Sequence, residues 1–364
     1  MFAQDSIWTS LQLPIIALSP MDGVTDVPFR TITKKYGHPD LIFTEFSSAE
    51  GLGHGASELL KEFRYTPDHH PIIGQIYGTT PEFFRQSAIL LCELGFDGVD
   101  INMGCPAKNV AHSGAGAALI KTPQLAQKII KATQQGVAEW QNGATLADCP
   151  DFTAKILSQV QNQQQQLKLL STTNNQLAQR RLVPISIKTR IGFDTEIVGA
   201  WIPTLLEMKP AAISLHGRTL RQLYTGRSDW EAIGKAADLV KQSGLGTKIL
   251  GNGDIDSYQT AHQKIAEFNL DGVLIGRASF GNPWVFLETV PEILPTTKAR
   301  VALEHAQLFE LTYQSDSKFS FLPMRKHLSW YIHGFPQAKE IRIQLVQTHS
   351  SQEVKAIFQK FGLL

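Results

Sequence analysis

The sequence has few cysteines, and they are scattered along the chain. Three cysteines, at positions 92, 105 and 149, are too few for a disulfide framework, and no Cys-x-x-Cys spacing suits a zinc site. Long apolar runs are also missing, since no segment approaches the roughly 18 apolar residues of a membrane span. Residues 1–14 lack the pattern of a signal peptide. We therefore expect a cytoplasmic protein, monomeric, with no metal and no membrane anchor.

A strong charge of either sign is absent as well. The 34 Lys and Arg residues nearly balance the 33 Asp and Glu residues, so the formal net charge is +1. Global charge therefore does not indicate a nucleic-acid partner, and any such signal must be local. Residues 296–364 hold such a signal, because nine Lys and Arg residues stand there against five Asp and Glu residues.

Eight short apolar runs, bounded by Gly or Pro and mostly followed by helical patterns, are typical of buried parallel strands. They lie at Ile15–Met21, Leu41–Phe46, Ile72–Gly78, Gly98–Gly104, Ile185–Arg190, Ala212–Arg218, Lys248–Asp254 and Gly272–Ala278. Eight alternating β and α units favour an α/β fold of the closed (β/α)₈ TIM-barrel type. An open doubly wound sheet is the alternative.

The segments between the runs predict helices and a second domain. Residues 81–95 begin with Pro and end with Gly, and residues 229–244 and 256–269 each open with an Asp suited to an N-cap. Helical patterns also occupy residues 302–313, 323–334, 337–346 and 351–361. We therefore expect a catalytic barrel over 1–295, a polar Gln/Asn-rich insertion at about 141–183, and an all-helical C-terminal domain over 296–364. The insertion contains QNQQQQ at 161–166 and STTNNQ at 171–176.

Polar residues cluster where the predicted strands end, which is where barrel enzymes place their reactive groups. Some of them could instead close the barrel mouth by hydrogen bonding. GNGD (251–254) and IGRA (275–278) follow strands seven and eight, where glycine lets backbone N–H groups approach a phosphate. GAGAAL (114–119) follows a loop rather than a strand, so it does not indicate a dinucleotide fold. Lys188 and His216 could stabilise negative charge on a phosphate-bearing cofactor, although His216 could also be structural.

Cys105 is the most informative residue. It lies between Gly104 and Pro106 directly after strand four, so we expect it on an exposed loop at the mouth, whereas Cys92 has the setting of a packed helix residue. No Cys-His-Asn signature accompanies Cys105, which favours acid chemistry by a protonated thiol. Residues 216–230, rich in Arg, Gln and Tyr, form either a base-binding loop or a solvated one.

These motifs resemble the bacterial tRNA-dihydrouridine synthase family, in order and over nearly the whole chain. The matching segments are SPMDGVTDVPFR (19–30), FTEF (43–46), GQIYG (74–78), DINMGCPAKNV (100–110), IKTRIGFD (187–194), HGRTLRQLYTGRSDW (216–230), GNGDI (251–255), DGVLIGRASFGNPW (271–284) and MRKHLSWYIHGFP (324–336). The resemblance implies FMN at the barrel mouth and a C-terminal domain that binds tRNA.

The resemblance also implies roles for single residues. Cys105 is similar to the catalytic acid of the family. The flavin-ring contacts it implies are Pro20, Met21, Gln75, Lys188 and His216, and Asn102 resembles a cofactor-site residue near flavin and substrate. The loops that grip the flavin phosphate correspond to Asn252, Gly253, Asp254, Gly276 and Arg277. The contacts to RNA that it implies are Glu45, Arg190, Arg218 and Gln222 at the mouth, and Arg325 and Lys326 in the helical domain.

The resulting hypothesis is the reduction of the C5–C6 double bond of uracil in tRNA. Hydride from reduced FMN goes to the electrophilic C6, and Cys105 donates a proton to C5. NADPH or NADH reduces FMN at the same mouth, in alternation with RNA. One alternative is a flavin barrel that acts on a free pyrimidine, like the dihydroorotate or dihydropyrimidine dehydrogenases. Another is an RNA-binding protein without catalysis.

Overall fold

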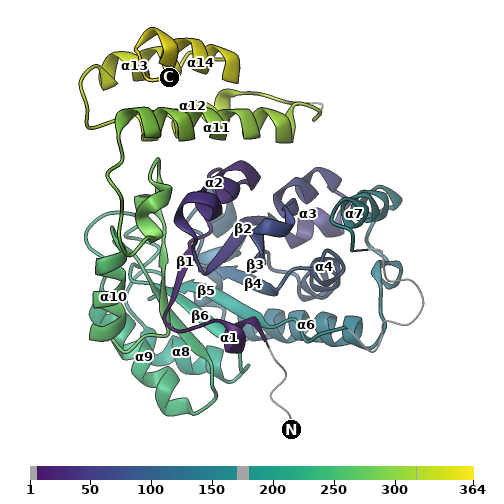
Figure 1. Ribbon diagram of the computed structural model, residues 1–364. Helices are drawn as coiled ribbons and strands as arrows, with labels where there is room; N and C mark the ends of the chain where they lie inside the picture. Colours follow the sequence, from purple (N-terminus) through teal and green to yellow (C-terminus); the bar gives the residue numbers. More distant parts are fainter. Residues whose placement is uncertain (1–5, 170–179, 317) are drawn as a thin grey trace.

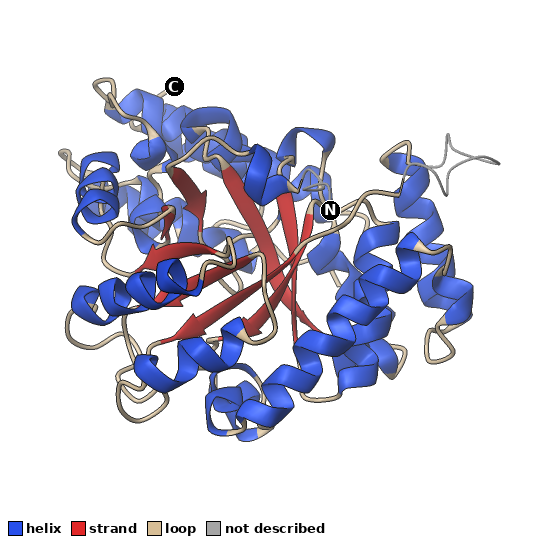
Figure 2. Cartoon of the chain, turned by 90° about the horizontal axis from the view of Figure 1, so that it is seen from below, coloured by secondary structure: helices blue, strands red, loops and turns tan. Residues whose placement is uncertain are grey.

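Eight parallel strands close into a barrel in chain order in this computed structural model, which describes residues 6–169, 180–316 and 318–364. Figure 2 shows the strands inside a ring of helices. The strands are β1 (Ile15–Leu18), β2 (Leu41–Ser48), β3 (Ile72–Tyr77), β4 (Gly98–Met103), β5 (Ile185–Arg190), β6 (Ala212–His216), β7 (Lys248–Asn252) and β8 (Gly272–Ile275).

The pairing of β1 with β8 closes the barrel, with Ile15 opposite Gly272 and Leu18 opposite Ile275. A Cβ atom on Gly272 would lie 2.2 Å from the carbonyl oxygen of Ile15, so the closing seam requires glycine. The predicted (β/α)₈ barrel is therefore confirmed and the open sheet is wrong. Each predicted apolar run holds one strand, but most strands end earlier than predicted because the chain turns into a loop at the mouth.

Helices surround the barrel. The α-helices of this part of the chain are α1 (Ile7–Ser10), α2 (Val27–Gly37), α3 (Ala49–Gly53), α4 (Pro81–Glu93), α5 (Lys108–His112), α6 (Pro123–Gln141), α7 (Ala154–Gln166), α8 (Val198–Leu206), α9 (Trp230–Ser243) and α10 (Tyr258–Glu267). Of these, α1 packs Ile7 and Trp8 against residues of the strands. Short 3₁₀ helices are η1 (Ser57–Phe63), η2 (Pro67–His69), η3 (Gly116–Lys121), η4 (Leu146–Asp148), η6 (Arg277–Ser279) and η7 (Pro283–Phe286). Asp229 caps α9 as predicted, but Ser257 rather than Asp256 caps α10.

Part of the predicted insertion is a packed helix. The glutamines at 161–166 belong to α7, which buries Ile156 and Val160 one helical turn apart. The side-chain amide of Gln163 donates to the carbonyl of Phe63 at 2.7 Å, and that of Gln164 donates to the carbonyl of Glu93 at 2.8 Å. Glutamine therefore fastens α7 to the outside of the barrel. The second polar stretch, at 171–176, lies outside the described residues.

The last part of the chain contains α11 (Pro295–Tyr313), α12 (Leu322–Tyr331), α13 (Ala338–Leu345) and α14 (Ser351–Lys360), here called the helical unit. In Figure 1 these helices form two layers above α2. The helical unit has its own apolar core, which Ile32 and Trp284 of the barrel also enter. Trp330 of α12 packs in turn against the barrel's core. The two parts of the chain therefore interlock.

Candidate active site at the barrel mouth

Hydrogen bonds join the ends of β3 and β4 to the loop that carries Cys105. Gln75 donates to Asp100 at 2.6 Å, and Asn102 donates to Gln75 at 2.9 Å. Asn102 Oδ1 accepts the backbone N–H groups of Cys105 at 2.8 Å and Gly104 at 3.0 Å. Burial raises the pKa of Asp100 to about 6. This chain of side chains orients the start of the Cys105 loop from inside the barrel.

Cys105 differs from the sequence-based expectation in one respect. It lies on a loop at the mouth, but its residue is only 8% exposed. The loop folds back on itself, since the N–H of Ala117 donates to the carbonyl of Cys105 at 3.3 Å and Val110 packs beside the thiol. Burial raises the pKa of the Cys105 thiol, against the opposing effect of Arg190 and Lys188. The thiol therefore stays protonated at neutral pH, as acid chemistry requires.

Lys188 and His216 lie on neighbouring strands of the same mouth. The Lys188 ammonium donates to Asn252 Oδ1 at 3.0 Å, and Asn252 donates onward to the carbonyl of Leu274 at 2.9 Å. Burial, with a smaller effect of Arg190, lowers the pKa of Lys188 to about 8. Burial also lowers the pKa of His216 well below its usual value, with Arg190 and Lys188 adding to the shift. The site thus contains a neutral imidazole and a lysine that titrates near physiological pH.

Each of the loops that follow β7 and β8 begins with a glycine. Gly253 has φ +128°, and a Cβ atom there would lie 2.0 Å from the hydroxyl of Ser228. A Cβ atom on Gly276 would lie 3.5 Å from the sulfur of Met21. Pro20 and Met21 are half-buried in the loop after β1, where the N–H of Met21 donates to Thr25 Oγ1 at 3.0 Å. The loop after β8 therefore lies beside the loop after β1, and the loop after β7 begins against Ser228 of the 216–230 loop. The contacts of these residues to a cofactor stay a prediction.

Asp254 has a different environment from the one expected for a cofactor contact. Its carboxylate accepts hydrogen bonds from Arg277 at 2.9 Å and from Arg218 at 2.7 Å, and it also accepts the N–H of Ser228 at 2.8 Å. The Arg277 side chain is 54% exposed and its guanidinium lies over the ring of Tyr224. The Asp254 carboxylate therefore holds both arginines in place. Arg277 stays exposed and is available to bind an anion.

Two arginines expected at the RNA are buried. Arg190 is 2% exposed and donates to the carbonyl groups of Gly104 at 2.7 Å and Thr219 at 3.0 Å. Arg218 is equally buried and, besides Asp254, donates to the carbonyl of Gly226 at 2.7 Å. Each guanidinium is thus already engaged in holding the 216–230 loop, and the contact of either arginine with RNA stays a prediction. Arg190 also ties that loop to the Cys105 loop.

Gln222 is half-buried and Glu45 is buried. Gln222 Oε1 accepts the N–H of Thr219 at 2.8 Å inside the 216–230 loop. Glu45 is buried, and this burial raises the pKa of its carboxyl well above the usual value, with Glu62 and Asp26 adding to the rise. Glu45 therefore belongs to a buried acidic group beside η1, and its predicted place near the RNA stays a prediction. Tyr224, by contrast, is 60% exposed in the same 216–230 loop.

The two predicted cations of the helical unit have different surroundings. Arg325 is half-buried and donates to the carbonyl of Thr348 at 2.8 Å, after the end of α13. Lys326 is exposed, and its ammonium donates to the carbonyl of Gly23 in the loop after β1. Lys326 therefore bridges the helical unit and the barrel mouth.

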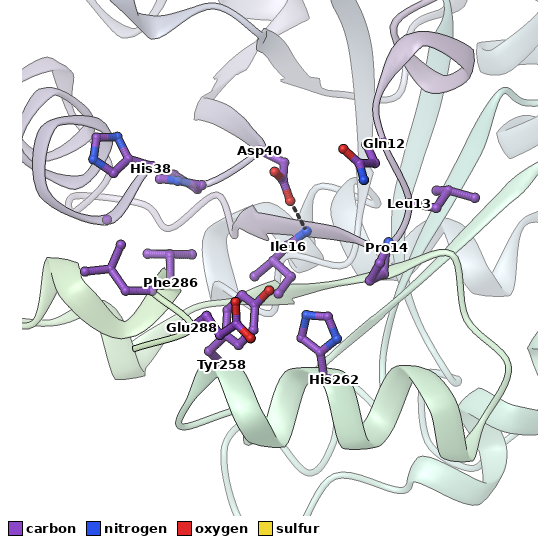
Figure 3. A pocket seen from close by; sticks show the side chains of 13 residues that line it. Gln12, Leu13, Pro14, Ile16, His38, Asp40, Tyr258, His262, Phe286 and Glu288 are labelled. Atoms are coloured by element: carbon purple, nitrogen blue, oxygen red, sulfur yellow. Dashed lines mark hydrogen bonds between the residues drawn. The ribbon is translucent and has the colours of Figure 1, made fainter. Parts of the chain in front are cut away.

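A pocket of about 340 Å³ lies at the opposite end of the barrel, between the start of β1 and α10. Figure 3 shows Asp40, Tyr258, His262 and Glu288 around it, with Asp40 accepting the N–H of Ile16 at 2.7 Å. It contains none of the predicted site residues. Over residues 6–169, 180–316 and 318–364, no cluster of His, Cys, Asp and Glu could hold a metal. No helix in that same part of the chain is long and apolar enough to cross a membrane.

Comparisons with known proteins agree with this arrangement. A match to the family described as Dihydrouridine synthase (Dus) covers residues 16–140 and 134–362. A probable tRNA-dihydrouridine synthase of Staphylococcus aureus (strain Mu50 / ATCC 700699) is 30% identical over 361 residues, which are 98% of this chain and 96% of that protein. Probable tRNA-dihydrouridine synthase 2 of Bacillus subtilis (strain 168) is 30% identical over 360 residues, covering 98% and 97%.

Among solved structures, morphinone reductase is similar over 82% of this chain and 94% of that chain, with 13% identity and a TM-score of 0.42. A likeness this weak adds nothing to the strand order described above. The match to the family and the relatives, by contrast, extend over nearly the whole chain. The chain belongs to the dihydrouridine synthase family.

Proposed function

We propose that this protein is a flavin-dependent oxidoreductase that reduces specific uridines of tRNA to 5,6-dihydrouridine. One observation carries the proposal. Cys105, a buried thiol whose raised pKa keeps it protonated, follows β4 directly, and the half-buried Lys188 lies on the neighbouring strand β5 opposite Asn102, so both stand at the same mouth of the barrel. Such a pair suits a reaction that adds a proton to one atom while negative charge develops nearby. The names of the relatives supply the substrate class.

The loops at the mouth fit FMN. Gly253 and Gly276 carry no side chain that would cover the backbone N–H groups of these loops, so a phosphate could approach them, and the exposed Arg277 can add a charge-assisted bond. Lys188 and His216 would contact the flavin ring, together with Gln75 and Asn102. When bound and reduced by NADPH or NADH, FMN supplies the hydride that goes to C6 of uracil.

The chain's own residues then complete the reaction at C5. Asn102 holds the Cys105 loop, so the thiol can donate its proton to C5 from one side of the uracil ring. The Lys188 ammonium would stabilise the negative charge that develops during the hydride transfer. The target base must leave its stack to reach the mouth, which costs a few kcal/mol that contacts elsewhere on the RNA must offset. The helical unit, which lies beside the β1 loop, supplies those contacts.

The test is a reconstituted reaction. Purified protein should carry FMN at about one per chain and, with NADPH, convert uridines of an unmodified tRNA transcript to dihydrouridine, detected by mass spectrometry after nuclease digestion. Uracil and UMP serve as controls. Reduction of the free pyrimidines but not of the transcript would establish the dehydrogenase-like alternative. Protein that binds tRNA but remains colourless after incubation with FMN would establish a non-catalytic RNA-binding protein.

A further inference from the structure

Helix α12 contacts both of the loops that flank the proposed flavin site. The β8 loop, residues 276–282, contains Gly276 and Arg277, and Phe280 near its end stacks on Trp330 of α12. The two ring centroids are 4.1 Å apart and the ring planes differ by only 12°. Phe280 and Trp330 both pack against the barrel's core. The Trp330 ring therefore packs against the barrel's apolar cluster, next to the loop that carries Arg277.

Gly281 allows the β8 loop to approach the backbone of α12 closely. It has φ +63°, and a Cβ atom on it would lie 2.2 Å from the carbonyl carbon and oxygen of Trp330. The β8 loop thus approaches the backbone of α12 as closely as glycine allows. Because backbone meets backbone here, side-chain rotation cannot absorb a shift of α12, and the loop must follow the helix.

The second loop, the β1 loop at residues 19–26, contains Pro20 and Met21. Its Gly23 has φ +67° and presents its carbonyl group to the ammonium of Lys326, four residues before Trp330 and so on the same side of α12. The sulfur of Met21 lies 3.5 Å from the position of a Cβ atom on Gly276. The β1 and β8 loops therefore meet each other, and one turn of α12 holds both.

We propose that Trp330 and Lys326 are positioning residues, through which α12 sets the β1 and β8 loops for the flavin and couples flavin binding to RNA binding by the helical unit. This inference rests on the proposed function. A ligand that orders α12 from the RNA side also orders the loops, so the second ligand to bind loses less conformational freedom. The coupling is reciprocal, and each ligand raises the affinity of the other by the same factor.

If the contacts of α12 with the two loops only stabilised the fold, a different result would be expected. Their loss would lower the free energy of unfolding and leave the affinity of the folded protein for FMN unchanged. The distinguishing measurement is therefore the dissociation constant of FMN for apoprotein, followed by quenching of flavin fluorescence well below the unfolding temperature and without RNA.

The variant is Trp330→Leu, and the matched control is Phe361→Leu, at the end of α14, away from both loops. We expect Trp330→Leu to weaken FMN binding about 3- to 10-fold, the range expected when the loss of one aromatic stack is fully transmitted. Phe361→Leu should bind FMN as the parent does. Equal FMN affinity in the folded parent and in Trp330→Leu would overturn the inference.

Lys326→Met gives an independent measurement, because the exposed side chain can be replaced without opening the core. Loss of its bond to Gly23 should weaken FMN binding about 2- to 5-fold. In the parent, an unmodified tRNA transcript should tighten FMN binding, and this effect should shrink in both variants. A parent that does not bind FMN overturns the proposed function. A parent that binds FMN, with variants identical to it, overturns only the coupling.

Discussion

Asn102 accepts the backbone N–H of Cys105 through Oδ1 at 2.8 Å, while its own amide donates to Gln75 at 2.9 Å. One amide side chain thus links the loop that carries the thiol to the floor of the barrel mouth. Only a group that both accepts and donates can make these two bonds. Asn102 on β4 therefore helps to position the backbone of the loop that carries the Cys105 thiol.

Replacing Cys105 with Ala should leave FMN binding and NADPH oxidation intact while slowing dihydrouridine formation about 10²- to 10⁴-fold, the usual contribution of a general acid. Stopped-flow bleaching of the flavin and mass spectrometry of the tRNA separate the two steps. Cys92→Ala is the control, because Cys92 is packed within α4 and should affect only thermal stability. Full activity in Cys105→Ala would show that the proton comes from elsewhere.

The pH dependence of flavin reduction should report on Lys188. Burial lowers the pKa of Lys188 to about 8, so the ammonium loses its charge as pH rises through that value. Reduction of FMN by NADPH should slow above pH 8, since a neutral amine no longer stabilises negative charge on the ring. Lys188→Met should be slow at every pH and show no fall near 8. The pKa of Cys105 is raised, so its thiol adds no earlier fall on the alkaline side. An unchanged alkaline fall in Lys188→Met would assign it to another group.

Arg190→Met should destabilise the protein by about 2–4 kcal/mol, because buried carbonyl groups lose a charged donor. The affected carbonyl groups belong to Gly104 and Thr219, in two different loops. Urea unfolding measures the loss, and Arg227→Met, an exposed arginine of the same 216–230 loop, is the control. A variant with parental stability but weakened tRNA affinity would support Arg190 as an RNA contact.

Replacing Arg325 and Lys326 together with Ala should weaken tRNA binding and reduce its salt dependence, with the slope falling by about one unit for each phosphate that the protein no longer neutralises. Binding is measured at saturating FMN, so that the β1 loop is occupied in every variant. Lys326→Ala alone is needed beside the double variant, because Arg325 also holds the segment after α13. If both variants keep the parental affinity and slope, the protein binds the RNA phosphates elsewhere on the chain.

The strands could be predicted because each is a short apolar run bounded by turn residues, and barrel closure followed from their number. The C-terminal helices could be predicted from helical periodicity, but their interlock with the barrel could not. Trp330 has the same local pattern whether it lies in the helical unit's core or against Phe280. The α10 cap was missed because Asp256 and Ser257 are both good capping residues, and only the backbone decides between them.

In the candidate site, the positions of the polar residues at the barrel mouth could be predicted from the sequence, but their hydrogen-bond partners could not. Arg190 ends β5 as predicted, and Arg218 lies two residues beyond the end of β6. The side chains of both are satisfied by carbonyl groups and a carboxylate from other loops. Residue type alone does not distinguish an arginine that waits for a phosphate from one that is already paired. Arg277 differs from these two arginines in that its side chain is 54% exposed.

The seam between β1 and β8 has a consequence for how the chain is made. The segments that pair there, at Ile15 and Gly272, leave the ribosome roughly 10–50 s apart, given synthesis at about 5–20 residues per second. During that interval β1 has an unpaired edge, which is a template for pairing with other chains. A nascent chain that stops before Gly272 cannot close, so translation pauses and truncations in this region should produce aggregation rather than a smaller working enzyme.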